Sequence, residues 1–255
     1  EIYTSLFVGS VKMCIRDRTC TSRRAARPRS TSRWRRPIEA TCPLGTKVHL
    51  EAVRYAKQGY TILLIGHEGH DEVIGTMGEA PEAMILVESE DAVDRLEVAD
   101  DSKVAYLTQT TLSVDDANRI IARIRQRFPQ VAAPPKGDIC YATQNRQEAV
   151  RIIADDVQLV LVVGSQNSSN SQRLKEIAIE QGKAAYLIDG VEDIDDAWFD
   201  SVETLMITAG ASAPENLVQD CVDYIQSHFD AEVESRVIRE EQVHFNLPKE
   251  LKSLL

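Results

Sequence analysis

ILLIGHEGHDEVIGTMG, residues 62–78, is the stretch that decides the fold of this chain. It starts within an apolar run, Thr61–Ile65, that has the length and composition of a buried parallel strand. Gly66 ends the run, and the polar loop that follows contains His70 and Glu72. Open α/β sheets bind ligands at the carboxyl ends of their strands, and an imidazole with a carboxylate can hold an anion and move a proton. The loop is therefore a candidate ligand site, although an ordinary polar turn would have a similar composition.

A second copy of this pattern lies 98 residues further along the chain. Gly66 is matched by Gly164, which also ends an apolar run and begins a polar loop. Cys42 and Cys140 have the same separation, and each precedes a helical pattern with the triplet Glu-Ala-Val. Two downstream stretches also correspond: VAYLTQTTLS (104–113) and ETLMITAGAS (203–212). Such an internal repeat predicts an α/β fold of two pseudo-repeated lobes, each with a parallel sheet.

The repeat and the composition divide the chain into four expected segments. The stretch before residue 39 is rich in Arg, Ser and Pro without periodicity, which predicts a disordered leader outside the fold. The end of the chain after residue 228 has one strand-like run and a charged terminus, and it belongs to neither repeat. The predicted segments are the leader at 1–38, the first lobe present at 39–136, the second lobe at 137–228 and the C-terminal tail at 229–255.

Hydrophobic runs and capping residues predict the individual elements. Pro43 suits the first position of a helix, and Ser113 suits an N-cap because Asp115 and Asp116 follow it in the first turn. Strands are predicted at 61–65, 84–87, 104–108, 159–163, 183–188, 204–208 and 232–238. Helices are predicted at 44–57, 89–96, 113–128, 145–154, 171–181 and 214–228, and a short acidic turn or helix at 194–200.

Charge and composition exclude several classes of protein. The net charge is −11, and residues 1–40 contribute +7 of it, so the rest of the chain carries −18. An acidic body argues against nucleic-acid binding. No apolar run approaches the roughly 20 residues that a membrane helix needs. The first residues lack the order of features of a secretion signal.

The five cysteines are too few, and odd in number, for a disulfide framework, and they indicate a reducing compartment. The repeat brings Cys42 and Cys140 to corresponding edges of their sheets. Two thiolates are too few for a structural zinc or an iron–sulfur cluster, which usually need about four ligands, so further ligands would have to come from another unit or a substrate. The alternative is that both are small buried apolar side chains, and this is the favoured interpretation for Cys221 in its helical pattern.

Six blocks of sequence carry a family resemblance: ATCPLGTKVH (40–49), IGHEGHDEVIGTMG (65–78), TQTTLSVDD (108–116), DICYATQNRQEAV (138–150), VVGSQNSSNSQRL (162–174) and TAGASAPENLV (208–218). Over about residues 39–250 the chain resembles the 4-hydroxy-3-methylbut-2-enyl diphosphate reductase family of the non-mevalonate isoprenoid pathway. The resemblance implies three α/β lobes around a central [4Fe-4S] cluster, with one cysteine from each lobe. The family's first lobe, with its Gly-Phe-Cys motif, is not recognised before Cys42, and neither Cys14 nor Cys20 lies in such a motif. We therefore expect a fragment with impaired activity.

The resemblance also implies roles for individual residues. Cys42 and Cys140 would be two of the three cluster ligands, and Glu72 would take part in proton delivery. Thr110 would lie near the substrate hydroxyl and Glu72. The residues implied to hold the diphosphate are His70, Ser168, Asn170 and Ser212, with Ser169 beside them. Neutral donors at the start of a helix and a histidine suit an anionic diphosphate.

The implied reaction converts (E)-4-hydroxy-3-methylbut-2-enyl diphosphate to isopentenyl and dimethylallyl diphosphate, with electrons from an external donor such as ferredoxin or flavodoxin. The implied location is the bacterial cytoplasm or a plastid, with no nucleic-acid or membrane partner. Two other hypotheses remain open: a non-redox diphosphate-binding α/β module, and a zinc hydrolase that uses His67, His70 and Glu72. The zinc hypothesis is the weakest, since two histidines three residues apart in a glycine loop are not the helical pair of common zinc hydrolases.

Overall fold

The structure, a computed structural model, describes residues 3–6 and 42–239, which form two compact units. Each unit is named here after its cysteine. Within the described residues, the Cys42 unit comprises 42–109 and 119–138, and the Cys140 unit comprises 3–6, 110–118 and 139–239. None of the helices formed by residues 42–239 combines the length and apolar character that a membrane span requires.

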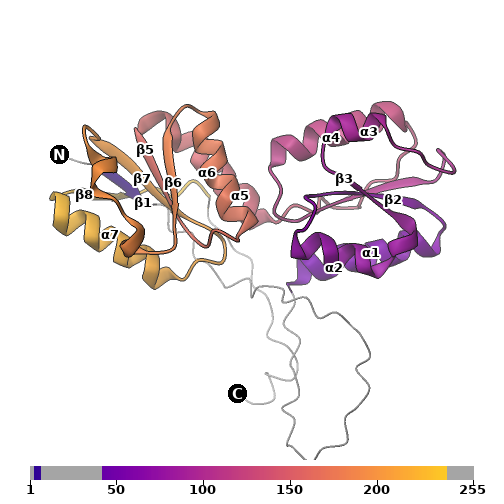
Figure 1. Cartoon of the computed structure of the whole chain (residues 1–255), viewed down its shortest axis with the longest axis horizontal. Coiled ribbons are helices and arrows are strands. Elements are labelled where there is room, and N and C mark those ends of the chain that lie inside the picture. The colour runs from indigo at the N-terminus through magenta and orange to yellow at the C-terminus, as the bar shows by residue number, and fades with distance from the viewer. Residues whose placement is uncertain (1–2, 7–41, 240–255) are drawn as a thin grey trace, which may run out of the picture. The chain divides into compact units, whose positions relative to one another are not determined.

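The Cys42 unit contains a three-stranded parallel sheet in the order β3-β2-β4 (Figure 1). Its elements are α1 (Pro43–Lys57), β2 (Thr61–Ile65), α2 (Asp71–Glu79), a 3-10 turn (Pro81–Ala83), β3 (Met84–Val87), α3 (Glu90–Asp94), β4 (Val104–Thr108) and the part of α4 (Val114–Arg127) from residue 119 onward. α1 packs its buried side chains Val48, Ala52 and Tyr55 against this sheet.

The Cys140 unit contains a five-stranded parallel sheet in the order β6-β5-β7-β1-β8. Its elements are β1 (Tyr3–Leu6), the first residues of α4, α5 (Tyr141–Ile153), β5 (Leu159–Val163), α6 (Ser169–Glu180), β6 (Ala184–Ile188), β7 (Thr204–Ala209), α7 (Glu215–Phe229), β8 (Glu232–Ser235) and 3-10 turns at Ala154–Asp156, Val191–Asp193 and Asp196–Phe199.

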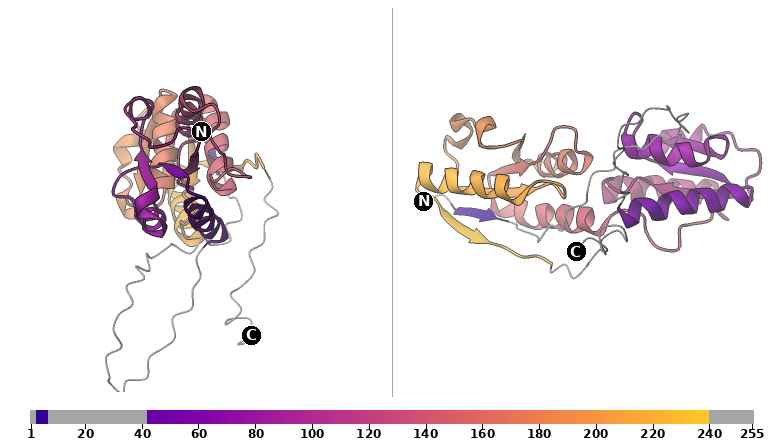
Figure 2. Two further views of the ribbon diagram at one scale, coloured as in Figure 1. Left: turned by 90° about the vertical axis from the view of Figure 1, so that its right-hand side faces the viewer. Right: turned by 90° about the horizontal axis from the view of Figure 1, so that it is seen from below.

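The strands of the Cys140 unit are covered on both faces, as their continuous apolar runs predict. Alternate residues of β5 point to opposite faces. Leu159 and Leu161 pack with Val218 and Cys221 of α7. Val160 packs on the other face, in a cluster formed mainly by α5 and α6. Figure 2 shows α7 and the α5–α6 pair on the two sides of this sheet.

The predicted repeat of two parallel-sheet lobes is confirmed by topology and by matching hydrogen bonds. β2 lies between β3 and β4, and β5 lies in the same way between β6 and β7. The Gly66 amide donates to the Val87 carbonyl at 3.2 Å, and the Gly164 amide donates to Ile188 at 2.8 Å. Each hydrogen bond fixes the point at which a polar loop leaves the sheet.

The N-terminal segment differs from its prediction. Tyr3–Leu6 lie in the stretch expected to be a disordered leader, yet they form β1, which pairs in parallel with β7 and β8 (Figure 2, right). The Arg-rich composition of the following residues predicts disorder, but Tyr3 and Thr4 belong to the residue types that favour strands. β8 likewise belongs to the sheet of the second repeat, whereas the tail was expected to stand apart. The rest of the predicted leader lies outside the described residues.

Two helices also depart from the expected bounds. α2 was interpreted only as a polar loop, because its glycines Gly75 and Gly78 mask the helical pattern. α5 begins at Tyr141, four residues before its predicted start, so that Cys140 is its N-cap. Thr110–Asn118 group with the Cys140 unit, although the sequence division placed them in the first lobe.

Glycines at strand ends allow close packing in both lobes. A Cβ atom at Gly66 would lie 2.6 Å from Val73 Cγ2, and one at Gly164 would overlap with Ser171 Oγ. Val73 and Ser171 are themselves 98 residues apart. A Cβ atom at Gly210, the residue directly after β7, would overlap with the same Ser171 hydroxyl. The first turns of α2 and α6 can therefore lie directly against the strand that precedes them.

We expect Gly164→Ala to lower the free energy of unfolding by about 1–3 kcal/mol, because the added methyl group overpacks a site with no room. Urea unfolding followed by circular dichroism measures this change. Gly78→Ala is the control: nothing lies within 4 Å of its Cβ position, and the helical substitution should raise stability by about 0.5–1 kcal/mol. Equal stability of Gly164→Ala and the parent chain would contradict the packing described here.

Candidate metal-ligand and diphosphate-binding residues

Cys42 and Cys140 occupy equivalent positions, each as the N-cap of a helix. Their backbone angles agree closely, with φ −56° and ψ 129° at Cys42 and φ −58° and ψ 133° at Cys140. The Cys42 carbonyl accepts from the Thr46 amide at 3.0 Å, and the Cys140 carbonyl accepts from Gln144 at 2.9 Å. The amino end of a helix carries positive partial charge, which suits a thiolate that binds metal. Each cysteine therefore lies, within its own unit, where a helix end would favour the thiolate form.

Cys221 has a different environment. It lies in the middle of α7 and is fully buried among apolar side chains. Burial is the main factor that raises the pKa of its thiol, to about 11. A neutral thiol is a poor metal ligand, so Cys221 is a core residue, as its helical pattern indicated.

Among residues 42–239, no three side chains of His, Cys, Asp or Glu lie close enough together to hold a metal ion by themselves.

His70 and Glu72 come together at the start of α2. His70 is the N-cap, and its Nδ1 accepts a hydrogen bond from the Glu72 amide at 3.2 Å. A hydrogen bond accepted at Nδ1 leaves Nε2 as the proton-bearing nitrogen of the neutral ring. Both side chains are half-buried. The pair can therefore offer a ring donor and a carboxylate to the same ligand.

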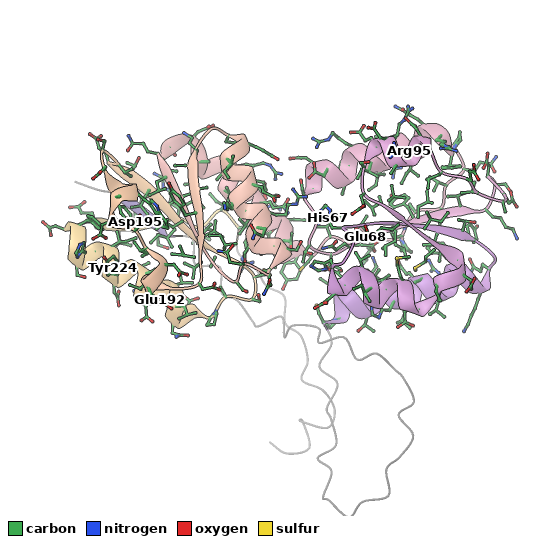
Figure 3. The ribbon with its side chains drawn as sticks, viewed as in Figure 1. His67, Glu68, Arg95, Glu192, Asp195 and Tyr224 are labelled. Atoms are coloured by element: carbon green, nitrogen blue, oxygen red, sulfur yellow. The ribbon has the colours of Figure 1, made fainter. Side chains whose placement is uncertain are left out.

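The loop between β2 and α2 is held in place by side chains from neighbouring strands. The His67 amide donates to Gln109 Oε1 at 3.1 Å, and the Glu68 amide donates to Glu88 Oε1 at 2.7 Å. Gly69 takes a positive φ of 77°, which favours glycine. Figure 3 marks His67 and Glu68 in this loop.

The polar loop after β5 leads into α6. Ser168 is the N-cap, and its Oγ accepts hydrogen bonds from the Ser171 amide at 3.3 Å and the Ser171 hydroxyl at 3.0 Å. Ser169 is half-buried and begins the helix. Asn170 is 4% exposed, and neither its amide nitrogen nor its amide oxygen has a hydrogen-bond partner in the structure. A buried polar group without a partner costs about 1–3 kcal/mol, so Asn170 is suited to an incoming ligand.

The loop after β7 lies beside the start of α6. A Cβ atom on Gly210 would be 3.8 Å from Asn170 Nδ2. Gly210 also donates its amide to the Val163 carbonyl at 2.9 Å, which fixes the loop to the end of β5. Ser212 is exposed two residues further on. The structure thus brings the predicted Ser168–Asn170 cluster and the Ser212 loop to the same edge of one sheet.

Thr110 is half-buried, and its carbonyl accepts a hydrogen bond from the Cys140 amide at 2.9 Å. The predicted proximity of Thr110 to Glu72 stays a prediction, since the two residues belong to different units. The joint binding of one diphosphate by His70 and the Ser168 loop also stays a prediction, because these residues belong to different units as well.

Sequence reasoning missed a buried ion pair in the Cys42 unit. Lys47 Nζ lies 2.7 Å from Asp138 Oδ1 and also donates to the Lys136 carbonyl at 2.6 Å. Asp138 Oδ2 accepts from the Thr108 amide at 3.0 Å. Burial raises the pKa of the Asp138 carboxyl, and Lys47 and the Thr108 amide oppose that change. The last described residue of the Cys42 unit is therefore tied to α1 of the same unit.

Sequence reasoning also passed over Arg146 and Gln147, which are 3% and 0% exposed. The sequence contained one indication of their burial. Both residues lie at helical spacing from Val150, on the side of α5 that also carries Ala149 into the core. Interior polar residues of this kind are normally hydrogen-bonded for a structural or functional reason.

Comparison with known proteins identifies close relatives. A family described as LytB protein matches residues 23–226. The chain is 62% identical over 216 residues to the 4-hydroxy-3-methylbut-2-enyl diphosphate reductase of Rhodopirellula baltica, and 54% identical over 217 residues to that of Nocardia farcinica. These alignments cover 85% of the chain and 68% and 65% of the two relatives, so the chain spans about two thirds of their length. The family match begins at residue 23, whereas the quoted blocks begin at residue 40.

The fold has a counterpart of known structure. The E-1-hydroxy-2-methyl-but-2-enyl-4-diphosphate reductase from Plasmodium falciparum is similar, with a TM-score of 0.81 and 37% sequence identity. The similarity covers 85% of this chain and 69% of that chain.

Proposed function

Because the chain belongs to the LytB family of 4-hydroxy-3-methylbut-2-enyl diphosphate reductases, we propose that it acts in the reductive removal of the hydroxyl group from (E)-4-hydroxy-3-methylbut-2-enyl diphosphate. The reaction consumes two electrons and two protons, and the C–O bond breaks with release of water. The carbon skeleton leaves as isopentenyl or dimethylallyl diphosphate. We also propose a small external redox protein, such as ferredoxin or flavodoxin, as the electron donor, since no amino-acid side chain supplies electrons for this step.

The diphosphate binds at the carboxyl edge of the Cys140 sheet. The observation that carries this assignment is the buried Asn170 amide, whose two polar atoms have no partner. Ser168, Ser169 and Ser212 supply hydroxyl donors at the same edge, and the start of α6 adds positive partial charge. His70 can add a ring donor or, when protonated, a positive charge.

Cys42 and Cys140 suit an iron–sulfur cluster, because both lie at helix amino ends with the same backbone conformation. Bound there, a [4Fe-4S] cluster would supply the electrons and a metal ion for the hydroxyl oxygen. The family resemblance implies a third cysteine ligand, and we propose that a lobe of the family type provides it. Glu72 delivers the proton that turns the hydroxyl into a departing water, and Thr110 orients that hydroxyl.

Asn170→Ala tests the binding assignment. We expect it to weaken the binding of inorganic pyrophosphate by roughly 10- to 100-fold, the effect of losing hydrogen bonds to a charged ligand of about 1.5–3 kcal/mol. The free energy of unfolding should not fall, since the amide has no partner to lose. Isothermal titration calorimetry and urea unfolding measure the two quantities.

The matched control is Asn118→Ala, which removes an exposed amide on α4 and should leave pyrophosphate binding unchanged. Unchanged binding by Asn170→Ala would remove the diphosphate site from this loop. Pyrophosphate binding without any iron uptake, even beside a family first lobe, would favour the non-redox diphosphate-binding module instead.

A further inference from the structure

We propose that Arg146 and Gln147 are positioning residues, which hold the loops of Thr110 and Ser212 against the helix that begins at Cys140. The inference rests on the proposed function, because it concerns the loops assigned there to substrate. All these residues belong to the Cys140 unit.

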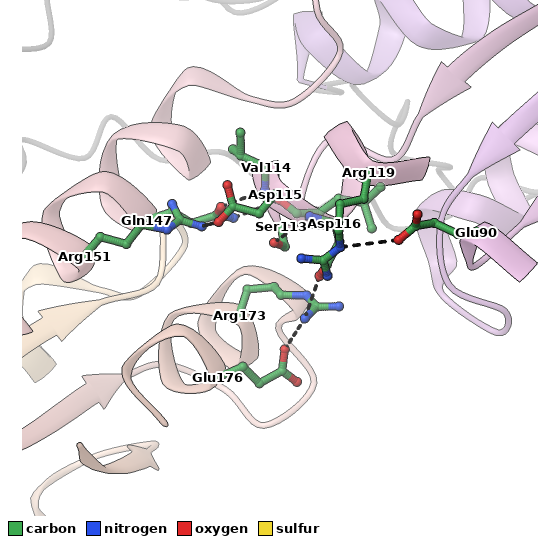
Figure 4. Close-up of polar contacts among 11 residues, drawn as sticks. Glu90, Ser113, Val114, Asp115, Asp116, Arg119, Gln147, Arg151, Arg173 and Glu176 are labelled. Carbon is green, nitrogen blue, oxygen red and sulfur yellow. Dashed lines mark hydrogen bonds and ion pairs between the residues drawn. The ribbon is translucent and has the colours of Figure 1, made fainter. Parts of the chain in front are cut away.

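Gln147 holds the loop that follows β4. Its Nε2 donates to the Leu112 carbonyl at 2.8 Å. Its Oε1 accepts from the Val114 amide at 3.0 Å, and Figure 4 labels both of these residues. The Gln147 side chain thus pairs with one backbone carbonyl and one backbone amide of the loop, as the peptide groups of a neighbouring strand would. Since Gln147 is fully buried, its hydrogen bonds to these backbone groups are shielded from water. The path of the chain from Thr110 into α4 therefore depends on this amide.

Arg146 holds the end of β7. Its Nε donates to the Ala209 carbonyl at 3.2 Å, and its Nη1 donates to the Ala142 carbonyl at 3.1 Å. Ala209 lies three residues before Ser212, and Ala142 lies in the first turn of α5. The rigid guanidinium fork links these two carbonyls in a way that a flexible ammonium does not. A buried cation is costly unless it is hydrogen-bonded, and these two carbonyls accept from it.

The two residues act together with the start of their own helix. The Cys140 amide donates to the Thr110 carbonyl at 2.9 Å, so the Thr110 loop is bound both at its beginning and, by Gln147, at its end. α5 consequently carries Cys140 at its first turn and fixes a loop on each side of it. A shift of α5 would move the proposed metal ligand and both substrate loops at once.

Two ion pairs also lie on this segment. Arg151 lies 2.5 Å from Asp115, and Arg173 lies 3.3 Å from Asp116 (Figure 4). Asp115 is more than half exposed, and an exposed pair typically contributes about 0–1 kcal/mol. The half-buried ion pair of Arg173 and Asp116 joins two side chains, not backbone groups of either loop. The buried Gln147 amide and Arg146 guanidinium therefore set the positions of the Thr110 and Ser212 loops.

The chain offers matched controls away from this edge. Gln158 accepts from the Glu203 and Thr204 amides, at 2.6 and 3.2 Å, and so binds two backbone groups at the amino edge of the same sheet. Arg127 donates to the Val93 and Leu96 carbonyls in the Cys42 unit. Gln158→Met and Arg127→Lys alter side-chain hydrogen bonds to backbone groups, accepted by an exposed amide and donated by a guanidinium, without touching either loop.

The experiment uses the full 255-residue chain and three probes: inorganic pyrophosphate, (E)-4-hydroxy-3-methylbut-2-enyl diphosphate and dimethylallyl diphosphate. Arg146→Lys should weaken the binding of all three by at least tenfold, through displacement of the Ser212 loop. Gln147→Met should leave pyrophosphate affinity within about twofold, abolish any preference for the hydroxylated ligand, and speed hydrogen exchange of the Val114 amide at least tenfold. Gln158→Met and Arg127→Lys should change no affinity.

If Gln147→Met does not fold, Gln147→Glu replaces it, since the carboxylate keeps the acceptor for Val114 and loses only the donor to Leu112.

Three outcomes of the experiment can be distinguished. Unchanged pyrophosphate binding in Ser168→Ala and Asn170→Ala would overturn the proposed function and this inference with it. Weakened binding in those two, with Arg146→Lys and the Gln147 variants indistinguishable from their controls, would overturn the positioning roles alone. The positioning roles would also be overturned if the Arg146 and Gln147 variants and their controls lost stability and affinity to the same extent.

Discussion

Glu72→Gln is expected to keep substrate binding and to lose turnover by about 100- to 10,000-fold, the usual contribution of a general acid or base. The protein for this test joins residues 39–255 to the first lobe of a family member. Glu72 is half-buried in the first turn of α2, beside the ring of His70 that accepts its amide hydrogen bond at 3.2 Å. An amide has nearly the shape of the carboxylate, so the fold and the diphosphate contacts should persist, but it cannot relay a proton. Turnover at saturating substrate and pyrophosphate affinity measure the two effects separately.

Glu68→Gln is the matched control, because Glu68 is an exposed carboxylate four residues earlier in the same loop. It should turn over at a near-normal rate. His70→Ala should instead weaken diphosphate binding, as expected for a contact with an anion. Near-normal saturated turnover by Glu72→Gln would reduce Glu72 to a structural residue of the loop.

Cys42→Ser and Cys140→Ser are each expected to abolish stable iron binding in the same combined protein. Both sulfurs lie at the N-cap of a helix, and a serine hydroxyl is a much weaker ligand than a thiolate for an iron–sulfur cluster. Iron content per chain after anaerobic reconstitution, together with the visible absorption of the cluster, measures the loss without reference to activity.

Cys221→Ala should bind as much iron as the parent protein, because its neutral, buried thiol lies inside α7. Iron that survives in Cys42→Ser or Cys140→Ser, or that disappears in Cys221→Ala, would show that the cluster ligands are assigned to the wrong residues.

Much of the fold could be predicted because its signals are local. The apolar runs at Thr61–Ile65 and Leu159–Val163 became β2 and β5 at the predicted positions, and Ser113 caps α4 through a 3.3 Å hydrogen bond to the Asp116 amide. The equivalence of Cys42 and Cys140 followed from their spacing alone, and the two N-caps agree with it.

The parts that could not be predicted depend on residues distant in sequence. β1 is a strand because β7 and β8 provide its hydrogen-bond partners, which lie more than 200 residues away in the sequence. Nothing around Arg146 or Gln147 in the sequence indicates that their partners are Ala209 and Leu112. The Lys47–Asp138 pair joins positions 91 residues apart. Such contacts are decided by tertiary packing, which periodicity and capping rules do not describe.

The 98-residue spacing also pairs the site residues of one lobe with those of the other. His70 corresponds to Ser168, both as helix N-caps, and by the same spacing Glu72 corresponds to Asn170. One copy of a duplicated scaffold thus carries ionisable side chains at the positions where the other carries neutral hydrogen-bonding ones. The same backbone position therefore offers a carboxylate in one lobe, where we propose proton delivery, and a neutral amide in the other, where we propose a contact to the diphosphate.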